Sequence, residues 1–380
     1  MPVAGVDPYS RPALGAPLEP KPTLPMIPPC SLSRAVRMIS GFLICTFVFA
    51  FSAAADSIRV LTIGNSFADN ATRYLERLAA SQDVEMHIER ANLGGCDLAR
   101  HHRHLKAYLE DPASEEGSPY KDPDGDPDEK RSLVQALQSQ AWDFVTIQQV
   151  SWRSFDPSTH EPHARAIIKT IREYAPHAEI LVHQIWAYRA DHAWFQGVSE
   201  PETGKGNQVA NPVSQREMYE RLTAAYEGLA SRYFLRLLPV GDAFQRARES
   251  AAWSFTYADP DFDYENPPDG EAPRQEGSLN VGWAWLKNWR TGKVRFRHDP
   301  NHANEAGCYL GASVWFETIA GQALTDEAWH PAELSAEQAA SLRKIAGEAV
   351  RARAPRESDR LEPYADNPRY WQMNGEPVLL

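Results

Sequence analysis

The chain has 380 residues, of which 43% are hydrophobic and 24% are charged, a composition typical of a globular protein with a large core. The formal net charge of -12, with no basic stripe along the sequence, argues against nucleic acid as a partner. A neutral or carbohydrate ligand is more compatible with this charge.

The N-terminus has the pattern of an export signal. Arg34 and Arg37 precede the apolar run 39–51, and the alanines at 53–55 are the small residues that signal peptidase requires. We expect residues 1–55 to be an N-terminal extension with a signal peptide, and the mature protein to be periplasmic or extracellular without stable membrane insertion. An uncleaved anchor is the weaker alternative, because the apolar run is shorter than the roughly 20 residues that span a bilayer.

The rest of the chain divides into a domain over residues 56–330 and a C-terminal helix and tail over residues 331–380. Cys96 and Cys308 are the cysteines that remain after signal cleavage. Two cysteines are too few for a disulfide scaffold, and the sequence leaves open whether they pair. It also leaves the oligomeric state open.

From residue 56 onward, strand patterns alternate with helix patterns. Runs of β-branched and apolar residues predict strands, and apolar residues three or four positions apart predict helices. The predicted strands are Ile58 to Gly64, Val84 to Arg90, Trp142 to Ile147, Ala178 to Trp186 and Leu235 to Val240. The predicted helices are Phe67 to Ser81, Leu98 to Leu109, Pro162 to Tyr174, Ser214 to Tyr233 and Ala303 to Ile319. This alternation predicts parallel strands with helices on both faces and a ligand site at the carboxyl ends of the strands.

The segment from Asp111 to Arg131 interrupts this pattern with many acidic residues, prolines and glycines. Its carboxylates do not have the spacing of a twelve-residue calcium loop, so a solvated insertion is the better interpretation. His101, His102 and His104 on the preceding helix do not converge on one face, and we expect them on a solvated surface rather than around a metal ion.

Two further insertions, Asp191 to Pro212 and Ala258 to Phe296, are predicted to be irregular. Loops of this length in a compact domain usually form lids or binding walls, or are disordered. Both contain aromatic residues that could stack on sugar rings, although packing against the body of the protein is the more frequent use of tryptophan. These aromatic residues are Trp194, Phe195, Trp283, Trp285 and Trp289.

The C-terminal part opens with Ser335 and Gln338, which predict a capping box for a helix ending near Arg353. The tail ends on an apolar run after Asn374-Gly375, a pair typical of a hairpin. This tail is similar to the opening strands of some glycosidase-type barrel domains, which leaves a further domain as an alternative.

The stretch Gly64-Asn65-Ser66-Phe67 follows the first predicted strand and opens its helix. That position would place Ser66 at the carboxyl end of a strand, beside the free N–H groups of a helix N-terminus, where an alkoxide or oxyanion is stabilised. The alternative is that Ser66 only caps the helix, with Asp69 completing a box-like pair.

A second stretch, Arg297 to His302, precedes the last predicted helix. Asp299 lies three residues ahead of His302, so its carboxylate can bind the imidazole Nδ1 and leave Nε2 free to accept a proton from a serine. The alternative is an ordinary turn in which Asp299 caps the helix.

Together, these stretches resemble the SGNH (GDSL-type) hydrolase superfamily, and within it the DUF4886-like branch with a Gly-Asn-Ser-Phe first block. The resemblance covers about residues 56–325 and implies a flavodoxin-like three-layer α/β/α sandwich with a five-stranded, mainly parallel sheet. It implies that Ser66 is the nucleophile, that Gly95 in Asn92-Leu93-Gly94-Gly95 binds the oxyanion with the Ser66 N–H, and that Asp299 and His302 are the acid and the base. No metal or organic cofactor is expected.

One feature departs from the family. The usual asparagine after the third strand, which donates to the oxyanion, is missing here, and Gln148 and Gln149 stand in that region. A glutamine amide offers the same N–H₂ group one methylene farther away. We therefore expect Gln148, or else Gln149, to complete the oxyanion hole.

The sequence predicts a serine esterase that removes acyl groups, most plausibly acetyl, from a small-molecule or polysaccharide ester through an acyl-serine. The alternatives are a lipase or thioesterase, and a catalytically inactive glycan-binding domain in which Ser66 and His302 remain as cap and turn residues. A flavodoxin-like nucleotide binder is excluded, because the first turn lacks the glycines or hydroxyl groups that would bind a phosphate.

Overall fold

The computed structural model describes residues 57–126, 128–197, 207–255, 259–288, 291–354, 362–364, 371–373 and 376–378. The signal peptide predicted within residues 1–55 lies outside the described residues, as does Trp289. None of the helices in the described part of the chain is long and apolar enough to cross a bilayer.

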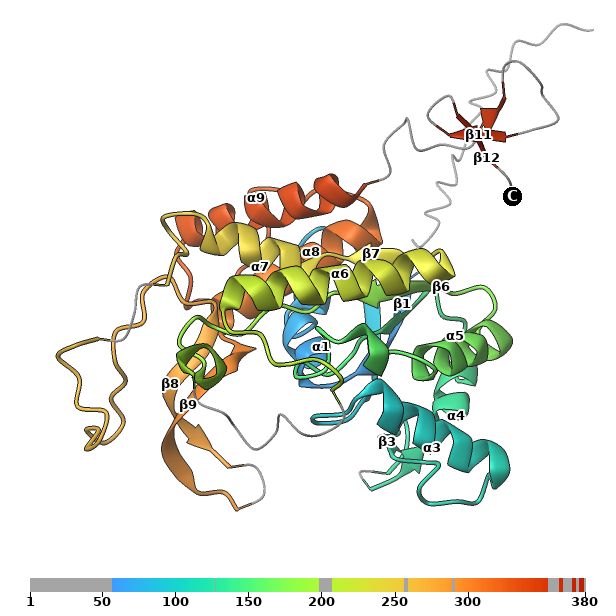
Figure 1. The fold of residues 1–380 in the computed structure, drawn as a ribbon, viewed down its shortest axis with the longest axis horizontal. Coiled ribbons are helices and arrows are strands. Elements are labelled where there is room, and N and C mark those ends of the chain that lie inside the picture. Colours follow the sequence, from blue (N-terminus) through green and yellow to red (C-terminus); the bar gives the residue numbers. More distant parts are fainter. Residues whose placement is uncertain are drawn as a thin grey trace, which may run out of the picture. The chain divides into compact units, whose positions relative to one another are not determined.

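Five strands form one parallel sheet (Figure 1). They are β1 (Ile58–Gly64), β2 (Met86–Asn92), β5 (Phe144–Ile147), β6 (Glu179–His183) and β7 (Arg236–Leu238). Their spatial order is β2-β1-β5-β6-β7, which is the flavodoxin-like order 2-1-3-4-5 when the strands are counted along the chain. The predicted α/β fold is therefore confirmed.

The strand order reverses at β1, because the next two strands of the sheet, β2 and β5, lie on opposite sides of it. Open parallel sheets bind ligands at the carboxyl ends of the strands beside such a reversal. In this protein that position is the end of β1 at Gly64, immediately before Ser66.

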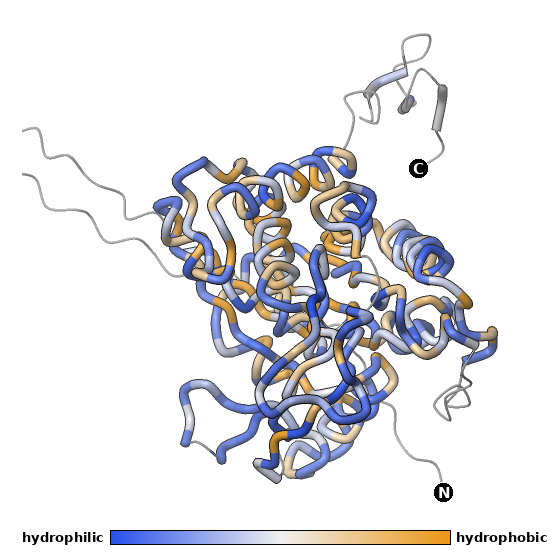
Figure 2. Tube along the Cα trace, turned by 90° about the vertical axis from the view of Figure 1, so that its left-hand side faces the viewer, coloured by the Kyte–Doolittle hydropathy of each residue, from blue (hydrophilic) through white to orange (hydrophobic). Residues whose placement is uncertain are grey.

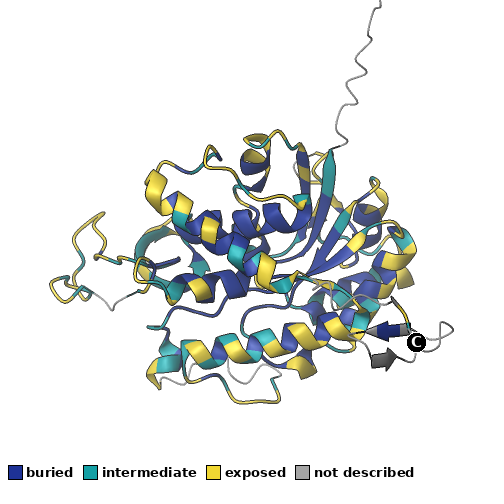
Figure 3. Ribbon diagram, turned by 90° about the horizontal axis from the view of Figure 1, so that it is seen from above, coloured by how far each residue is buried: buried dark blue, intermediate teal, exposed yellow. Residues whose placement is uncertain are grey.

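Helices cover both faces of the sheet (Figure 3). Those described are α1 (Ser66–Ala71), α2 (Leu75–Ala80), α3 (Leu98–Glu110), α4 (Leu133–Gln138), α5 (His163–Tyr174), α6 (Gln215–Tyr233), α7 (Val240–Arg248), α8 (Glu305–Ala320) and α9 (Ala336–Arg353). α3, α4 and α5 pack together, whereas α1, α2 and α7 pack on α8, which α9 also contacts. α8 is buried along almost its whole length, and its sequence is accordingly apolar all round. The outer loops of the described chain are mainly hydrophilic, whereas apolar residues recur along the packed segments (Figure 2).

Two predictions about helices have different outcomes, one for the helix after β1 and one for the start of α9. The single helix predicted from Phe67 to Ser81 is wrong, because the chain forms α1 and α2 with a break at Thr72. The Thr72 hydroxyl donates to the Ala68 carbonyl at 2.9 Å, a back-bond that bends helices. The capping box of Ser335 and Gln338 at the start of α9 is confirmed.

The insertion predicted to be irregular from Ala258 to Phe296 contains most of a hairpin. β8 (Asn280–Lys287) and β9 (Val294–Ala303) pair antiparallel, and aromatic side chains on one face stack across the strands. The Trp283 ring lies 5.3 Å from that of Phe296 and 4.6 Å from that of His298. Such cross-strand pairs stabilise a two-stranded hairpin, and they explain why the irregular assignment was wrong.

The C-terminal tail contains a small antiparallel sheet of β10 (Glu362–Pro363), β11 (Trp371–Met373) and β12 (Glu376–Val378). β11 and β12 flank the predicted Asn-Gly turn. Cys96 and Cys308, whose pairing the sequence left open, are both buried free thiols.

The acidic insertion is anchored to the domain at Tyr120 and at its last residue, Arg131. β3 (Tyr120–Lys121) and β4 (Lys130–Arg131) pair there, and buried Arg131 forms an ion pair with buried Glu89 of β2. The solvated-insertion prediction therefore fits the exposed acidic residues of the segment and is wrong for Tyr120 and Arg131.

Arg131→Ala should lower the free energy of unfolding by about 3–5 kcal/mol, because it leaves the Glu89 carboxylate buried without its partner. Urea denaturation followed by circular dichroism measures this loss. Arg103→Ala is the matched control: it breaks an exposed pair with Glu116 and should cost no more than about 1 kcal/mol. Equal losses in the two variants would contradict the anchoring role.

Candidate active site

The β1–α1 turn, formed by Gly64, Asn65 and Ser66, presents the predicted nucleophile. Asn65 is the N-cap of α1, and its Oδ1 accepts the N–H of Phe67 at 3.1 Å. The alternative in which Ser66 caps the helix is therefore wrong. Because Asn65 fills that role, the Ser66 hydroxyl is left for another partner.

That partner is His302. The Ser66 Oγ lies 2.8 Å from His302 Nε2, although 236 residues separate the two in the chain. His302 Nδ1 lies 2.9 Å from Asp299 Oδ2 and 3.1 Å from Asp299 Oδ1. Because a carboxylate only accepts, Nδ1 donates to Asp299, and Nε2 of the neutral imidazole can accept the serine proton.

Hydrogen bonds keep Asp299 in its charged form. Burial alone would raise the pKa of this carboxyl group, but the imidazole of His302 and the backbone N–H groups of Asn301 and His302 outweigh burial and lower it. The two N–H groups lie 3.2 and 3.1 Å from Asp299 Oδ1.

The segment that carries Asp299 and His302 is not the helix-start turn that the sequence suggested. Both residues lie near the end of β9, and α8 begins only at Glu305, after its N-cap Asn304. The register between β8 and β9 shifts between Asn280 and Gly282. Because of this irregularity, β9 can pair with β8 while the backbone N–H groups of Asn301 and His302 donate to Asp299.

A small cavity of ≈ 110 Å³ opens beside the Ser66 hydroxyl. It is lined by Asn65, Ser66, Phe67, Gly95, Val150, Ser151, Trp152, Asn301 and His302. Ser66 supplies a first-turn N–H of α1, and such groups have no acceptor within a helix. Gly95 has a positive φ of 60°, and the tip of the Trp152 ring lies 3.2 Å from where a Cβ would stand. A side chain at position 95 would therefore crowd this wall.

Neither glutamine is placed as predicted. Gln148 Nε2 donates to Asn65 Oδ1 at 2.9 Å, and Gln149 Nε2 donates to the Thr159 carbonyl at 2.9 Å. Both side chains are buried, and neither lines the cavity. The expectation that one of them completes the oxyanion hole is therefore wrong. Gln148 stabilises the β1–α1 turn through Asn65, and Gln149 stabilises the loop that follows β5 through Val150 and Thr159.

His101 is a second support of this turn, and its predicted solvated position is wrong. It is fully buried, its Nε2 donates to the Gly64 carbonyl at 3.0 Å, and its Nδ1 accepts from the Tyr120 hydroxyl at 2.8 Å. Burial lowers the pKa of His101 to about 4. His104 is buried as well, and the described residues contain no group of three or more potential ligands placed to hold a metal ion.

Trp152 and Asn301 are among the cavity residues that sequence reasoning did not assign to the site. Asn301 stands between Asp299 and His302, and Trp152 follows the carboxyl end of β5, where ligands of such sheets bind. Position alone could have identified both. Trp194, an aromatic residue of the first insertion, does not line the cavity. It is buried against Phe155 and Tyr188 and contributes to packing.

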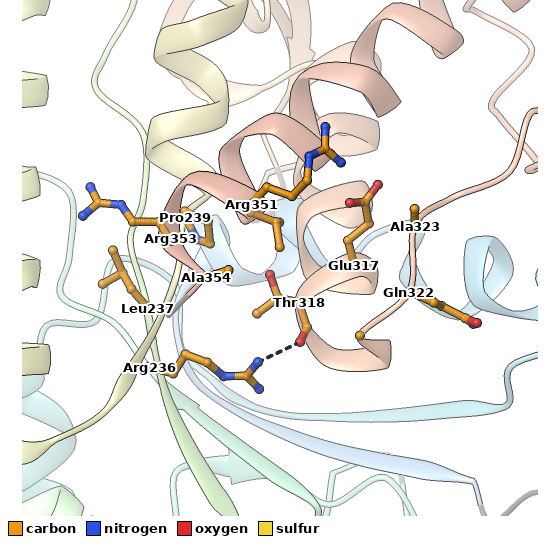
Figure 4. Close-up of a pocket in the computed structure, with 12 residues that line it drawn as sticks. Arg236, Leu237, Pro239, Glu317, Thr318, Gln322, Ala323, Arg351, Arg353 and Ala354 are labelled. Carbon is orange, nitrogen blue, oxygen red and sulfur yellow. Dashed lines mark hydrogen bonds between the residues drawn. The ribbon is translucent and has the colours of Figure 1, made fainter. Parts of the chain in front are cut away.

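A larger cavity of ≈ 300 Å³ lies elsewhere, between the start of β7 and the ends of α8 and α9 (Figure 4). Two of its three arginines are paired: Arg236 bonds Glu179 and the Thr318 carbonyl, and Arg353 bonds Asp242 and Glu227. No serine or histidine lines it. Of these two cavities, the smaller one at Ser66 is therefore the one lined by a hydroxyl and an imidazole that could carry out acyl transfer.

A family model described as Domain of unknown function (DUF4886) matches residues 59–252, which is half of the chain. The protein belongs to this family. The match confirms the DUF4886 assignment made from sequence and includes Ser66 and Gly95, whereas Asp299 and His302 lie beyond it. No curated protein matches the sequence of this DUF4886 protein.

Solved structures resemble the DUF4886 protein in fold. A DUF4886 family protein from Bacteroides uniformis is 23% identical with a TM-score of 0.55, over 78% of this chain and 95% of that one. A proposed GDSL-like lipase from Parabacteroides merdae (13%, TM-score 0.37, 70% and 96% covered) and the periplasmic domain of a lipopolysaccharide acetyltransferase from Salmonella ser. Paratyphi A (12%, TM-score 0.36, 70% and 83% covered) are more distant.

The burial of neutral His101 predicts a pH dependence of stability. Its pKa is about 4 in the folded chain and about 6.5 when unfolded, so between these values the unfolded state binds the extra proton. The stabilisation is complete above pH 6.5 and is lost as the pH falls toward 4, at about 1.4 kcal/mol per pH unit at most. Urea titrations from pH 7.5 to 4.5 should show a shallower slope for His101→Gln than for wild type. A slope unchanged by His101→Gln would contradict the assignment.

Proposed function

We propose that this protein is a serine esterase that hydrolyses short acyl esters, most plausibly acetyl esters of carbohydrates, through an acyl-serine intermediate. The observation that carries the proposal is the hydrogen-bonded chain from Ser66 Oγ through His302 to Asp299, with contacts of 2.8 and 2.9 Å. A hydroxyl, an imidazole and a carboxylate in this order are the parts of a nucleophilic triad.

In the proposed mechanism, Ser66 Oγ attacks the ester carbonyl carbon as His302 Nε2 takes the hydroxyl proton. Asp299 holds the imidazolium that forms and keeps its Nδ1–H directed away from the serine. The oxyanion lies against the N–H groups of Ser66 and Gly95. His302 then gives the proton to the leaving alkoxide, and a water molecule, deprotonated in the same way, releases the acid and restores Ser66.

The substrate class is proposed from three observations. The cavity of ≈ 110 Å³ holds only three or four groups of about 30 Å³, the share of one water molecule, which matches an acetyl ester and not a long acyl chain. The acidic net charge of -12 and the export signal inferred for residues 1–55 favour a neutral extracellular or periplasmic ester, such as an acetylated glycan. A long-chain lipase would need more apolar space beside Ser66.

Ser66→Ala should abolish turnover of p-nitrophenyl acetate, since it removes the nucleophile, and it should leave the thermal unfolding midpoint near that of wild type. Steady-state kinetics and a fluorophosphonate probe, which labels only an activated serine, give two independent readouts. Ser158→Ala is the matched control, because Ser158 bonds Asp156 in a surface turn and should retain both turnover and labelling. Wild-type turnover or labelling in Ser66→Ala would refute the proposal, and an inert wild-type protein would favour the glycan-binding alternative.

Trp152→Ala should broaden the acyl preference, because the Trp152 ring closes the wall beside Gly95. Wild type should prefer acetate to octanoate, at roughly tenfold or more for each methylene that does not fit. The variant should lower the acetate-to-octanoate ratio of kcat/KM by roughly tenfold or more. Trp329→Ala, whose ring packs on Tyr74 and Arg77, should keep the wild-type ratio. An unchanged ratio in Trp152→Ala would show that this wall does not set acyl length.

A further inference from the structure

We propose that the side-chain amide of Asn301 binds hydroxyl groups on the alcohol portion of the substrate, so that the site selects polyhydroxylated alcohols. The inference rests on the esterase function proposed above and concerns the half of the ester that Trp152 does not contact.

The side-chain amide of Asn301 has no hydrogen-bond partner among the described residues. Its side chain lines the cavity beside Ser66 and His302, yet Oδ1 is buried with no hydrogen bond, and Nδ2 has no acceptor among the described residues. The amides nearby differ, since Asn65, Gln148 and Gln149 are all hydrogen-bonded on both ends. A buried polar atom left unpaired costs about 1–3 kcal/mol, a cost that a bound ligand would remove.

The position of Asn301 indicates which part of the ester it meets. His302 Nε2 must deliver a proton to the leaving oxygen, so the alcohol portion leaves on the side of His302. Asn301 is the residue next to His302 on β9, whereas the oxyanion donors come from α1 and from the segment between β2 and α3. Asn301 lines the same cavity as His302, so its amide is available to the alcohol portion.

The chemistry of the amide indicates a hydroxyl ligand. An asparagine side chain has one donating and one accepting end. Among the described residues, Asn301 Oδ1 is buried without a partner and Nδ2 makes no hydrogen bond. A hydroxyl group both donates and accepts, so neighbouring hydroxyls of a sugar ring satisfy both ends, whereas a hydrocarbon alcohol satisfies neither. A site that bonds hydroxyls discriminates strongly against analogues that lack them.

The fold does not depend on this side chain. The Asn301 carbonyl accepts from Trp186 Nε1 at 2.9 Å and from Asn280 Nδ2 at 3.1 Å, and the Pro300 carbonyl accepts the N–H of Arg189 at 2.9 Å. These backbone bonds remain in Asn301→Ala, so His302 should stay in place.

The test compares two acetates whose alcohol portions have the same ring size: a monoacetylated methyl pyranoside and cyclohexyl acetate, which has no hydroxyl. For Asn301→Ala we expect kcat/KM on the pyranoside ester to fall about tenfold, the effect of one lost hydrogen bond, and kcat/KM on cyclohexyl acetate to stay within about twofold. Asn301→Ser, which keeps a donor and acceptor, should recover part of the loss. Asn266→Ala, on an exposed loop, is the matched control and should behave as wild type on both esters.

The outcomes separate this inference from the proposed function. Equal losses on both esters would place Asn301 at the reaction centre, and no loss on either would give it no role in binding; each result overturns the inference while leaving a serine esterase. A wild-type enzyme that prefers cyclohexyl acetate overturns it as well. Turnover that persists in Ser66→Ala would refute the esterase itself.

Discussion

The site depends on how the β1–α1 turn is held. The Gly64 carbonyl accepts from His101, the Asn65 side chain bonds both Gln148 and the Cys96 carbonyl, and Gln148 in turn accepts from His183. All these groups are neutral amides, carbonyls or imidazoles in a buried setting, where hydrogen bonds are strong and unpaired groups are costly. The turn therefore has one favoured conformation, and the Ser66 hydroxyl emerges from it toward His302.

The space under the turn also constrains its residues. A Cβ at Gly64 would stand 2.8 Å from Gln148 Oε1, so the glutamine occupies the volume that a larger residue at position 64 would need. The second glutamine, Gln149, accepts the N–H groups of Leu98 and Val150 and so joins the loop after β5 to the start of α3. Both glutamines thus shape the cavity without lining it.

The sequence predicted the sheet and the meeting of Ser66, His302 and Asp299 because both depend on local patterns. The β1 strand matches its predicted bounds from Ile58 to Gly64, and the serine turn, the Asp299–His302 spacing and Gly95 were all recognisable in short stretches. The partners of buried polar groups were not predictable in this way. Nothing near Gln148 indicates that Asn65, 83 residues earlier, takes its amide, and nothing near His101 indicates the Gly64 carbonyl. The β8–β9 hairpin was missed because its strands are stabilised by aromatic pairs across the hairpin rather than by burial in the sheet.

The pairing of residues 66 and 302 has a consequence for biosynthesis. A ribosome completes β1 and the turn long before it reaches β9, so an unfinished or truncated chain carries the serine without the imidazole that would activate it. In the folded protein the two residues are brought together where α1 packs on α8, the helix that follows β9. If the proposed mechanism holds, a nascent chain therefore carries the nucleophile without its base until β9 has been made.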